Sequence, residues 1–153
     1  MDKYIVDIIS NPMPVWDRII TRMSDDFSDS YDPKGDYFGV FKGGKLVGAF
    51  ILNAWNFICY EAHGGIDPDS YGEGLEICRA FGVSVFEDTP ALKLVCIVPS
   101  YNRLMCKCLE KCGLNQEGTI KKSFLKWGRL HDQILYGVTK SEARRIIWQQ
   151  EQA

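Results

Sequence analysis

Apolar residues recur along the chain at two different spacings, and the changes between them predict a series of strands and helices. Residues 4–9 form a short apolar run typical of a strand, and residues 15–23 repeat apolar positions at helical spacing. The acidic, serine-rich stretch that follows up to residue 36 indicates a loop. Its aspartates could attract a basic substrate, and a solvated loop without that role is the alternative.

A hairpin signal opens the middle of the chain. Residues 37–41 and 45–53 flank Gly43 and Gly44, and a glycine pair is favoured in a two-residue hairpin turn. Further along, strands are expected at residues 57–65, 92–98, 118–127 and 132–138, and helices at residues 75–86, 102–112 and 141–150. The resulting order, β-α-β-β-β-α-β-α-β-β-α, predicts an α+β fold with a central mixed sheet.

Length and composition narrow the class of protein. A chain of 153 residues fits one domain, which we expect to span residues 1–153. With 46% hydrophobic and 25% charged residues the chain is not of the disordered class. The net charge of −2 includes no basic excess, so a nucleic-acid partner is not expected. The longest apolar stretch, residues 47–54, is too short to span a membrane, and no signal-peptide pattern is visible. We therefore expect a soluble, cytoplasmic protein with no membrane partner.

The cysteines do not follow the paired spacing of a zinc site. Four of the six, Cys96, Cys106, Cys108 and Cys112, are separated by nine, one and three residues, and the last three fall in an expected helix. Zinc ligands more often come as C-x2-4-C pairs in loops. We therefore expect no metal site and interpret the cysteines as reduced, buried thiols.

A strand that leads into a Gly-x-Gly turn at the start of a helix is the main functional signal. Gly72 and Gly74 let the backbone approach a ligand closely, and the first N–H groups of a helix have no partner within it. Together with the helix dipole, such a terminus favours an anion. Glycine is also common in turns that only need to bend.

Two motifs around this turn resemble the GNAT superfamily of N-acetyltransferases, and most closely its Rim-type branch, which acetylates ribosomal-protein N-termini. The matching segments are Asp67-Pro68-Asp69, Tyr71-Gly72-Glu73-Gly74, Asn102, Leu109-Glu110-Lys111-Cys112-Gly113-Leu114 and Glu117-Gly118. The resemblance covers about half of the chain, from Glu61 to Tyr136. It implies a GNAT-like fold, in which a mixed, largely antiparallel sheet is flanked by helices.

The resemblance also implies acetyl-CoA as co-substrate. Amide groups for its pyrophosphate would come from four consecutive residues, Gly72, Glu73, Gly74 and Leu75. Asn102 would bind the pantetheine arm, a role compatible with its capping the next helix. The thioester would lie where the sheet splays, against the stretch that includes Gly65 and Ile66.

Three residues are candidates for proton transfer. Glu61 and His63 alternate onto one face of the same strand, and histidine is a side chain that commonly exchanges protons in catalysis, so His63 could accept a proton from an ammonium group. Tyr136 is a candidate general acid. The alternatives are a structural histidine, a solvated glutamate and a packed tyrosine.

Some positions depart from the family pattern. Asp69 stands where the family usually has Arg or Gln, and Glu73 adds a second negative charge near an anionic ligand. Leu109 and Met105 occupy the helix positions where many relatives carry a Tyr or Ser that reprotonates coenzyme A. These departures leave a non-enzymatic hypothesis open.

Two functions are therefore expected as alternatives. In the first, the protein transfers an acetyl group directly from acetyl-CoA to the amine of a protein N-terminus, a basic peptide or a small molecule. In the second, it resembles small acetyltransferase-like proteins of bacteriophages and acts as a binding or head-assembly protein, with a phage protein or a second copy of itself as partner. Its location would then be the host cytoplasm or the virion.

Overall fold

A computed structural model describes residues 3–12, 15 and 36–151. The helix expected at residues 15–23 and the acidic loop after it lie outside the described residues, apart from Val15 and Asp36. The other expected elements are all present.

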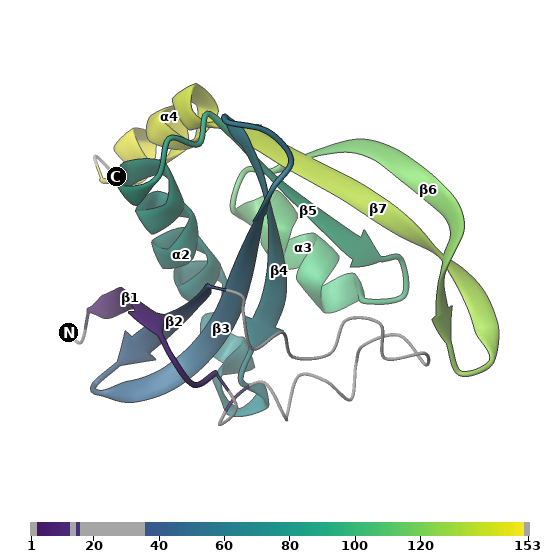
Figure 1. The fold of residues 1–153 in the computed structure, drawn as a ribbon, viewed down its shortest axis with the longest axis horizontal. Helices are drawn as coiled ribbons and strands as arrows, with labels where there is room; N and C mark the ends of the chain where they lie inside the picture. The colour runs from purple at the N-terminus through teal and green to yellow at the C-terminus, as the bar shows by residue number, and fades with distance from the viewer. Residues whose placement is uncertain (1–2, 13–14, 16–35, 152–153) are drawn as a thin grey trace.

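The chain folds around a seven-stranded sheet with the order β1-β2-β3-β4-β5-β7-β6 (Figure 1). The strands are β1 (Tyr4–Ile9), β2 (Tyr37–Lys42), β3 (Lys45–Ala54), β4 (Cys59–Ile66), β5 (Lys93–Pro99), β6 (Asn115–Lys126) and β7 (Arg129–Thr139). The helices are the 3-10 helix η2 (Pro68–Glu73) and the α-helices α2 (Gly74–Asp88), α3 (Arg103–Lys111) and α4 (Lys140–Glu151). Among the described strands, only β4 and β5 pair in parallel, so the sheet is mixed and largely antiparallel, as the sequence predicts.

Three details differ from the sequence-based expectation. The strand expected from residue 57, β4, begins at Cys59, because the Asn56 side-chain oxygen accepts the Ile58 and Cys59 N–H groups at 2.9 Å and holds the preceding residues in a turn. The strand expected from residue 118 begins at Asn115 and carries two register shifts. The expected Gly-x-Gly turn is a 3-10 helix that runs directly into α2.

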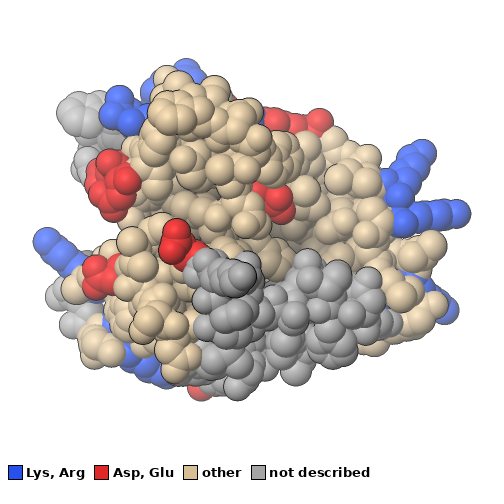
Figure 2. All heavy atoms as spheres, viewed as in Figure 1, with Lys and Arg blue, Asp and Glu red and all other residues tan. Residues whose placement is uncertain are grey.

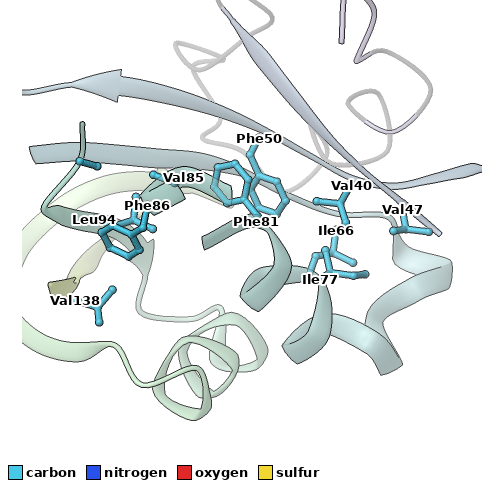
Figure 3. Packing of buried hydrophobic residues seen from close by; sticks show 11 residues of the cluster. Val40, Val47, Phe50, Ile66, Ile77, Phe81, Val85, Phe86, Leu94 and Val138 are labelled. Atoms are coloured by element: carbon cyan, nitrogen blue, oxygen red, sulfur yellow. The ribbon is translucent and has the colours of Figure 1, made fainter. Parts of the chain in front are cut away.

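The main core lies between α2 and one face of the sheet. Phe50 of β3 stacks on Phe81 of α2 with ring centroids 4.4 Å apart, and apolar side chains surround the pair on both sides (Figure 3). Met105 of α3 and Ala143 of α4 pack against the same cluster. Ala49 and Ile51, which flank Phe50 along β3, belong to a separate cluster with Val15 and Tyr37. Because neighbouring strand residues point to opposite faces, this second cluster lies on the face away from α2.

The parallel pairing of β4 and β5 is short. It joins Cys59 to Lys93, Tyr60 to Leu94 and Glu61 to Val95, and then stops. Beyond this point β4 continues to Ile66 paired only with β3, while β5 continues to Pro99 paired only with β7. The two strands therefore diverge in the middle of the sheet, and the divergence positions the candidate site.

Gly64 holds the diverging part of β4 close against β3. Its φ of +144° is a conformation that side chains rarely adopt. A Cβ atom at this position would lie 2.2 Å from the Ala49 carbonyl oxygen and 2.8 Å from Phe50 Cα. Only glycine fits here without moving the backbone.

Candidate functional site

A cavity of about 460 Å³ occupies the space between the diverging strands. Most of its lining comes from β4, η2, α2, β5 and α3. Most of the residues proposed from the sequence line it, namely Glu61, His63, Gly65, Ile66, Gly72, Gly74, Leu75 and Asn102. Glu73 and Tyr136 are not part of the lining. The structure thus gathers one group of predicted residues around one cavity and places the other two elsewhere.

The glycine-rich segment is ordered by its own hydrogen bonds. The buried Asp67 caps η2, with its side-chain oxygen accepting the Asp69 N–H at 3.4 Å. The Gly74 N–H, which the resemblance assigned to the cofactor, donates to the Tyr71 carbonyl. Nothing lies within 4 Å of the position that a Cβ of Gly72 would take. The end of η2 is therefore open to a ligand at Gly72, whereas the amide of Gly74, the first residue of α2, is already engaged.

Glu73 is turned away from the cavity. Its carboxylate accepts hydrogen bonds from the Tyr4 hydroxyl of β1 and the Lys42 ammonium of β2. The bond from Lys42 and then that from Tyr4 lower the pKa of Glu73, which stays ionised and paired. One of the two negative charges that the sequence places beside an anionic ligand is thus neutralised outside the cavity.

Basic residues from two helices line the cavity in its place. Arg79 lies on α2, and Lys107 and Lys111 lie four residues apart on α3. Residues at that spacing share one face of a helix. The spacing was readable from the sequence, but the direction of that face was not, because it depends on how α3 docks against the sheet.

Asn102 caps α3 at the edge of the cavity. Its side-chain oxygen accepts the Met105 N–H at 3.2 Å, an ordinary N-cap bond. The amide nitrogen has no part in this bond, so capping and ligand contact are compatible.

Glu61 and His63 line the cavity from β4. His63 pairs with Ile51, whose side chain lies in the cluster on the face away from α2. Since alternate residues share a face, both candidate proton acceptors point to that side of the sheet. The Glu61 carboxylate accepts a hydrogen bond from Trp55 Nε1 at 3.0 Å, which fixes its orientation.

Tyr136 lies beneath α3 rather than in the cavity wall. Only 1% of its surface is exposed, and its hydroxyl donates to Glu110 Oε1 at 3.0 Å. Burial, followed by the hydrogen bonds to Cys106 and Glu110, raises the pKa of this hydroxyl. This geometry is that of a packed core tyrosine, the alternative given above.

Two further findings bear on the class of protein. Within the described residues, no group of three His, Cys, Asp or Glu side chains is arranged to hold a metal ion. Searched over the same residues, none of the helices is both long and apolar enough to cross a membrane.

Solved structures similar to this chain share its fold. A spermidine N-acetyltransferase from Vibrio cholerae, in complex with CoA and spermine, superposes with a TM-score of 0.76 at 17% identity, covering 93% of this chain and 98% of that one. A GNAT family acetyltransferase from Elizabethkingia anophelis with acetyl-CoA bound gives 0.69 at 15% identity, covering 91% and 99%. An acetyltransferase of the GNAT family from Bacillus anthracis gives 0.68 at 18% identity, covering 90% and 96%.

These likenesses establish the GNAT acyl-CoA N-acyltransferase fold that the two sequence motifs implied. No curated protein matches the sequence. One family does match, over residues 9–150 and so over nearly the whole chain. The chain therefore belongs to the family described as "Protein of unknown function (DUF2824)".

Proposed function

We propose that this protein is an acetyl-CoA-dependent N-acetyltransferase, folded as a single domain over residues 1–153 and acting in the cytoplasm. The observation that carries the proposal is the cavity opened where β4 and β5 stop pairing after Glu61 and Val95. Two of the solved structures with this fold are complexes with CoA or acetyl-CoA.

The residues around the cavity fit a long anionic cofactor. Arg79, Lys107 and Lys111 supply positive charge for phosphate groups, and the α2 dipole adds to it. The cavity side of β4 beyond Glu61 forms no pairs with β5, so its backbone can pair with an amide-bearing arm. Gly72 leaves room for close approach.

The chain's own groups can then assist acyl transfer to nitrogen. Bound acetyl-CoA would supply the activated acyl group. Glu61 and His63 would accept the proton that the acceptor ammonium must lose before its nitrogen can attack. Holding the amine and the thioester side by side contributes about 7–11 kcal/mol to such reactions. A backbone N–H on the diverging part of β4 would stabilise the negative charge on the carbonyl oxygen.

The acceptor is an amine that is positively charged before reaction. Glu61 is the acidic residue in the described cavity lining, and it faces the side of the sheet away from α2. The acceptor classes that follow are a protein N-terminus, as in the Rim-type branch, and a polyamine such as the spermidine named for a similar structure.

Calorimetric titration of the reduced protein with acetyl-CoA tests the proposal. Gly72→Trp should fill the cavity mouth and weaken binding at least tenfold. Gly118→Trp is the matched control, because the space around Gly118 is equally open but Gly118 lies outside the cavity lining. Lys107→Ala and Lys111→Ala should weaken binding in a salt-dependent manner, and Lys121→Ala on β6 should not. If the parent protein shows no detectable binding up to millimolar acetyl-CoA, the proposal is overturned.

Activity is then measured with spermidine and with an N-terminal peptide as separate acceptors. Glu61→Gln and His63→Ala should each lower kcat while acetyl-CoA affinity stays unchanged. Equal loss of activity and of affinity would instead indicate that these residues only shape the cavity.

The β6–β7 hairpin favours a second function, that of a binding or assembly protein. Trp127 and Leu130 at its turn are 67% and 59% exposed. Lys and Arg side chains project from the end of the molecule where the β6–β7 hairpin lies (Figure 1, Figure 2). Under this second proposal, the protein either takes part in phage head assembly and resides in the virion, or forms a homodimer. It predicts that Trp127→Ala changes self-association in analytical ultracentrifugation and that acetyl-CoA has no effect on it.

A further inference from the structure

Three thiols from two helices meet in the cavity wall. Cys108 Sγ of α3 lies 3.8 Å from Cys78 Sγ of α2. Cys112, one turn after Cys108, places its sulfur 3.7 Å from the Leu75 carbonyl oxygen in the first turn of α2. All three residues line the cavity, and all are reduced. The cluster therefore spans the gap between the two helices that form the cavity walls.

The surroundings make Cys108 the most reactive of these thiols. Hydrogen bonding with Cys112 and then with Cys78 lowers the pKa of Cys108, and the charge of Lys111 acts in the same direction. The same contacts raise the pKa of Cys78 and Cys112. A thiolate stabilised by neighbouring thiols and a lysine is the form that attacks an oxidant.

The other cysteines provide a contrast within the same chain. Burial raises the pKa of Cys96 to about 12. Cys106, two residues before Cys108, is only 7% exposed and packs with Val98 and Leu109. Neither belongs to the thiol cluster.

We propose that Cys78 and Cys108 form a hydroperoxide-reactive dithiol pair whose disulfide ties α2 to α3 across the cavity. The Cys108 thiolate attacks one oxygen of the hydroperoxide, so that an S–O bond forms, the O–O bond breaks and an alcohol or water leaves. The Cys78 thiol then attacks the oxidised sulfur, forming the S–S bond and releasing water. Two thiols and one hydroperoxide thus give one disulfide, one alcohol or water, and one water. A dithiol reductant reverses the change.

The bond is within reach of small movements. The two sulfurs must close from 3.8 Å to about 2.05 Å, which side-chain rotation and a slight approach of the helices can provide. A bond between Cys108 and Cys112 would instead join the last turn of α3 to its own C-cap residue and would tie no two elements together.

Formation of this disulfide also affects acetyl-CoA binding, an inference that rests on the proposed function. Gly74 opens α2 beside the cluster, since its Cβ would lie 3.6 Å from Cys108 Sγ. The disulfide therefore fixes the wall nearest the start of α2, where the phosphate groups of the cofactor would bind. We expect oxidation to weaken acetyl-CoA binding at least tenfold.

The test maps the thiols after treatment with equimolar hydrogen peroxide. Free thiols are alkylated, and tryptic peptides are examined by mass spectrometry. Lys107 and Lys111 place Cys106, Cys108 and Cys112 in three separate tryptic peptides, so these three are distinguished from one another. Cys59 and Cys78 share the peptide of residues 46–79, so the Cys59→Ser variant distinguishes those two. We expect a Cys78–Cys108 cross-link, with Cys96 and Cys106 still reduced. Cys78→Ser and Cys108→Ser should abolish the cross-link, and Cys59→Ser should leave it intact.

Acetyl-CoA affinity is then compared between the reduced and oxidised protein. A tenfold loss of acetyl-CoA affinity on oxidation means that the reduction potential of the disulfide is about 30 mV less negative when acetyl-CoA is bound. A Cys108–Cys112 bond, overoxidised Cys108 without a cross-link, or no reaction would overturn the dithiol pair. A cross-link with unchanged affinity would overturn its effect on the cavity. If the reduced protein binds no acetyl-CoA, the proposed function fails, and the cross-link alone decides the present inference.

Discussion

Replacing Gly64 with alanine tests whether the divergence of β4 and β5 depends on one residue. The added Cβ would lie 2.2 Å from the Ala49 carbonyl oxygen and 2.8 Å from Phe50 Cα, both backbone atoms that cannot rotate away. The φ of +144° adds conformational strain of about 1–3 kcal/mol. To relieve the clash, β4 must move away from β3, which breaks pairs around Gly64. We therefore expect a loss of about 3 kcal/mol or more in the free energy of unfolding.

Urea denaturation and thermal melting measure this loss. For a chain of this size, about 3 kcal/mol corresponds to a fall in Tm of about 6–12 °C. Gly118→Ala is the matched control in a strand, because nothing lies within 4 Å of its added Cβ, and it should change stability by no more than about 0.5 kcal/mol. A Gly64→Ala protein that melts within about 2 °C of the parent would refute the reasoning, since β3 and β4 would then tolerate separation.

Substitutions at three further residues test individual contacts. Glu73→Gln should lower stability at neutral pH but not well below pH 4.5. The pairing that lowers the pKa of the Glu73 carboxylate stabilises the folded state, and this stability is lost as acid protonates the carboxylate. Urea midpoints at the two pH values measure the effect, and repeating them in high salt screens the ion pair with Lys42. Asn102→Ala should cost about 1 kcal/mol by removing the cap of α3, and Asn102→Asp should restore stability but not acetyl-CoA affinity, as denaturation and calorimetry would show. Tyr136→Phe removes the hydrogen bond to Glu110 and should cost about 1 kcal/mol in denaturation while leaving kcat unchanged; a large fall in kcat would restore Tyr136 as a catalytic candidate.

Local sequence patterns predict most of the strands and helices of the fold. The Gly43-Gly44 turn lies where the hairpin of β2 and β3 was predicted, and the strand and helix periods located the other described elements to within a few residues. These features depend on neighbours in sequence, which is why one sequence suffices to find them. The GNAT-like arrangement of those elements came from the motif resemblance rather than from periodicity.

Contacts between distant residues were not predictable in the same way. Glu73 and Tyr4 are 69 positions apart, so nothing local indicates that the Glu73 charge is paired outside the cavity. Lys107 and Lys111 lie in the lining because of how α3 docks, and Tyr136 finds Glu110 through the packing of β7 beneath that helix. Side-chain direction at the site is thus set by tertiary packing.

The three residue pairs between β4 and β5 join two halves of the sheet. One half is β1 to β4, the other is β5 to β7, and residues of both halves pack in the core around Phe81 of α2. A ligand bound between the two halves must contact both, so it opposes their separation. Ligand binding would therefore raise resistance to unfolding, by about 2.7 kcal/mol at a hundredfold excess over Kd. Slower amide hydrogen exchange in both β4 and β5 on ligand binding would report the same coupling.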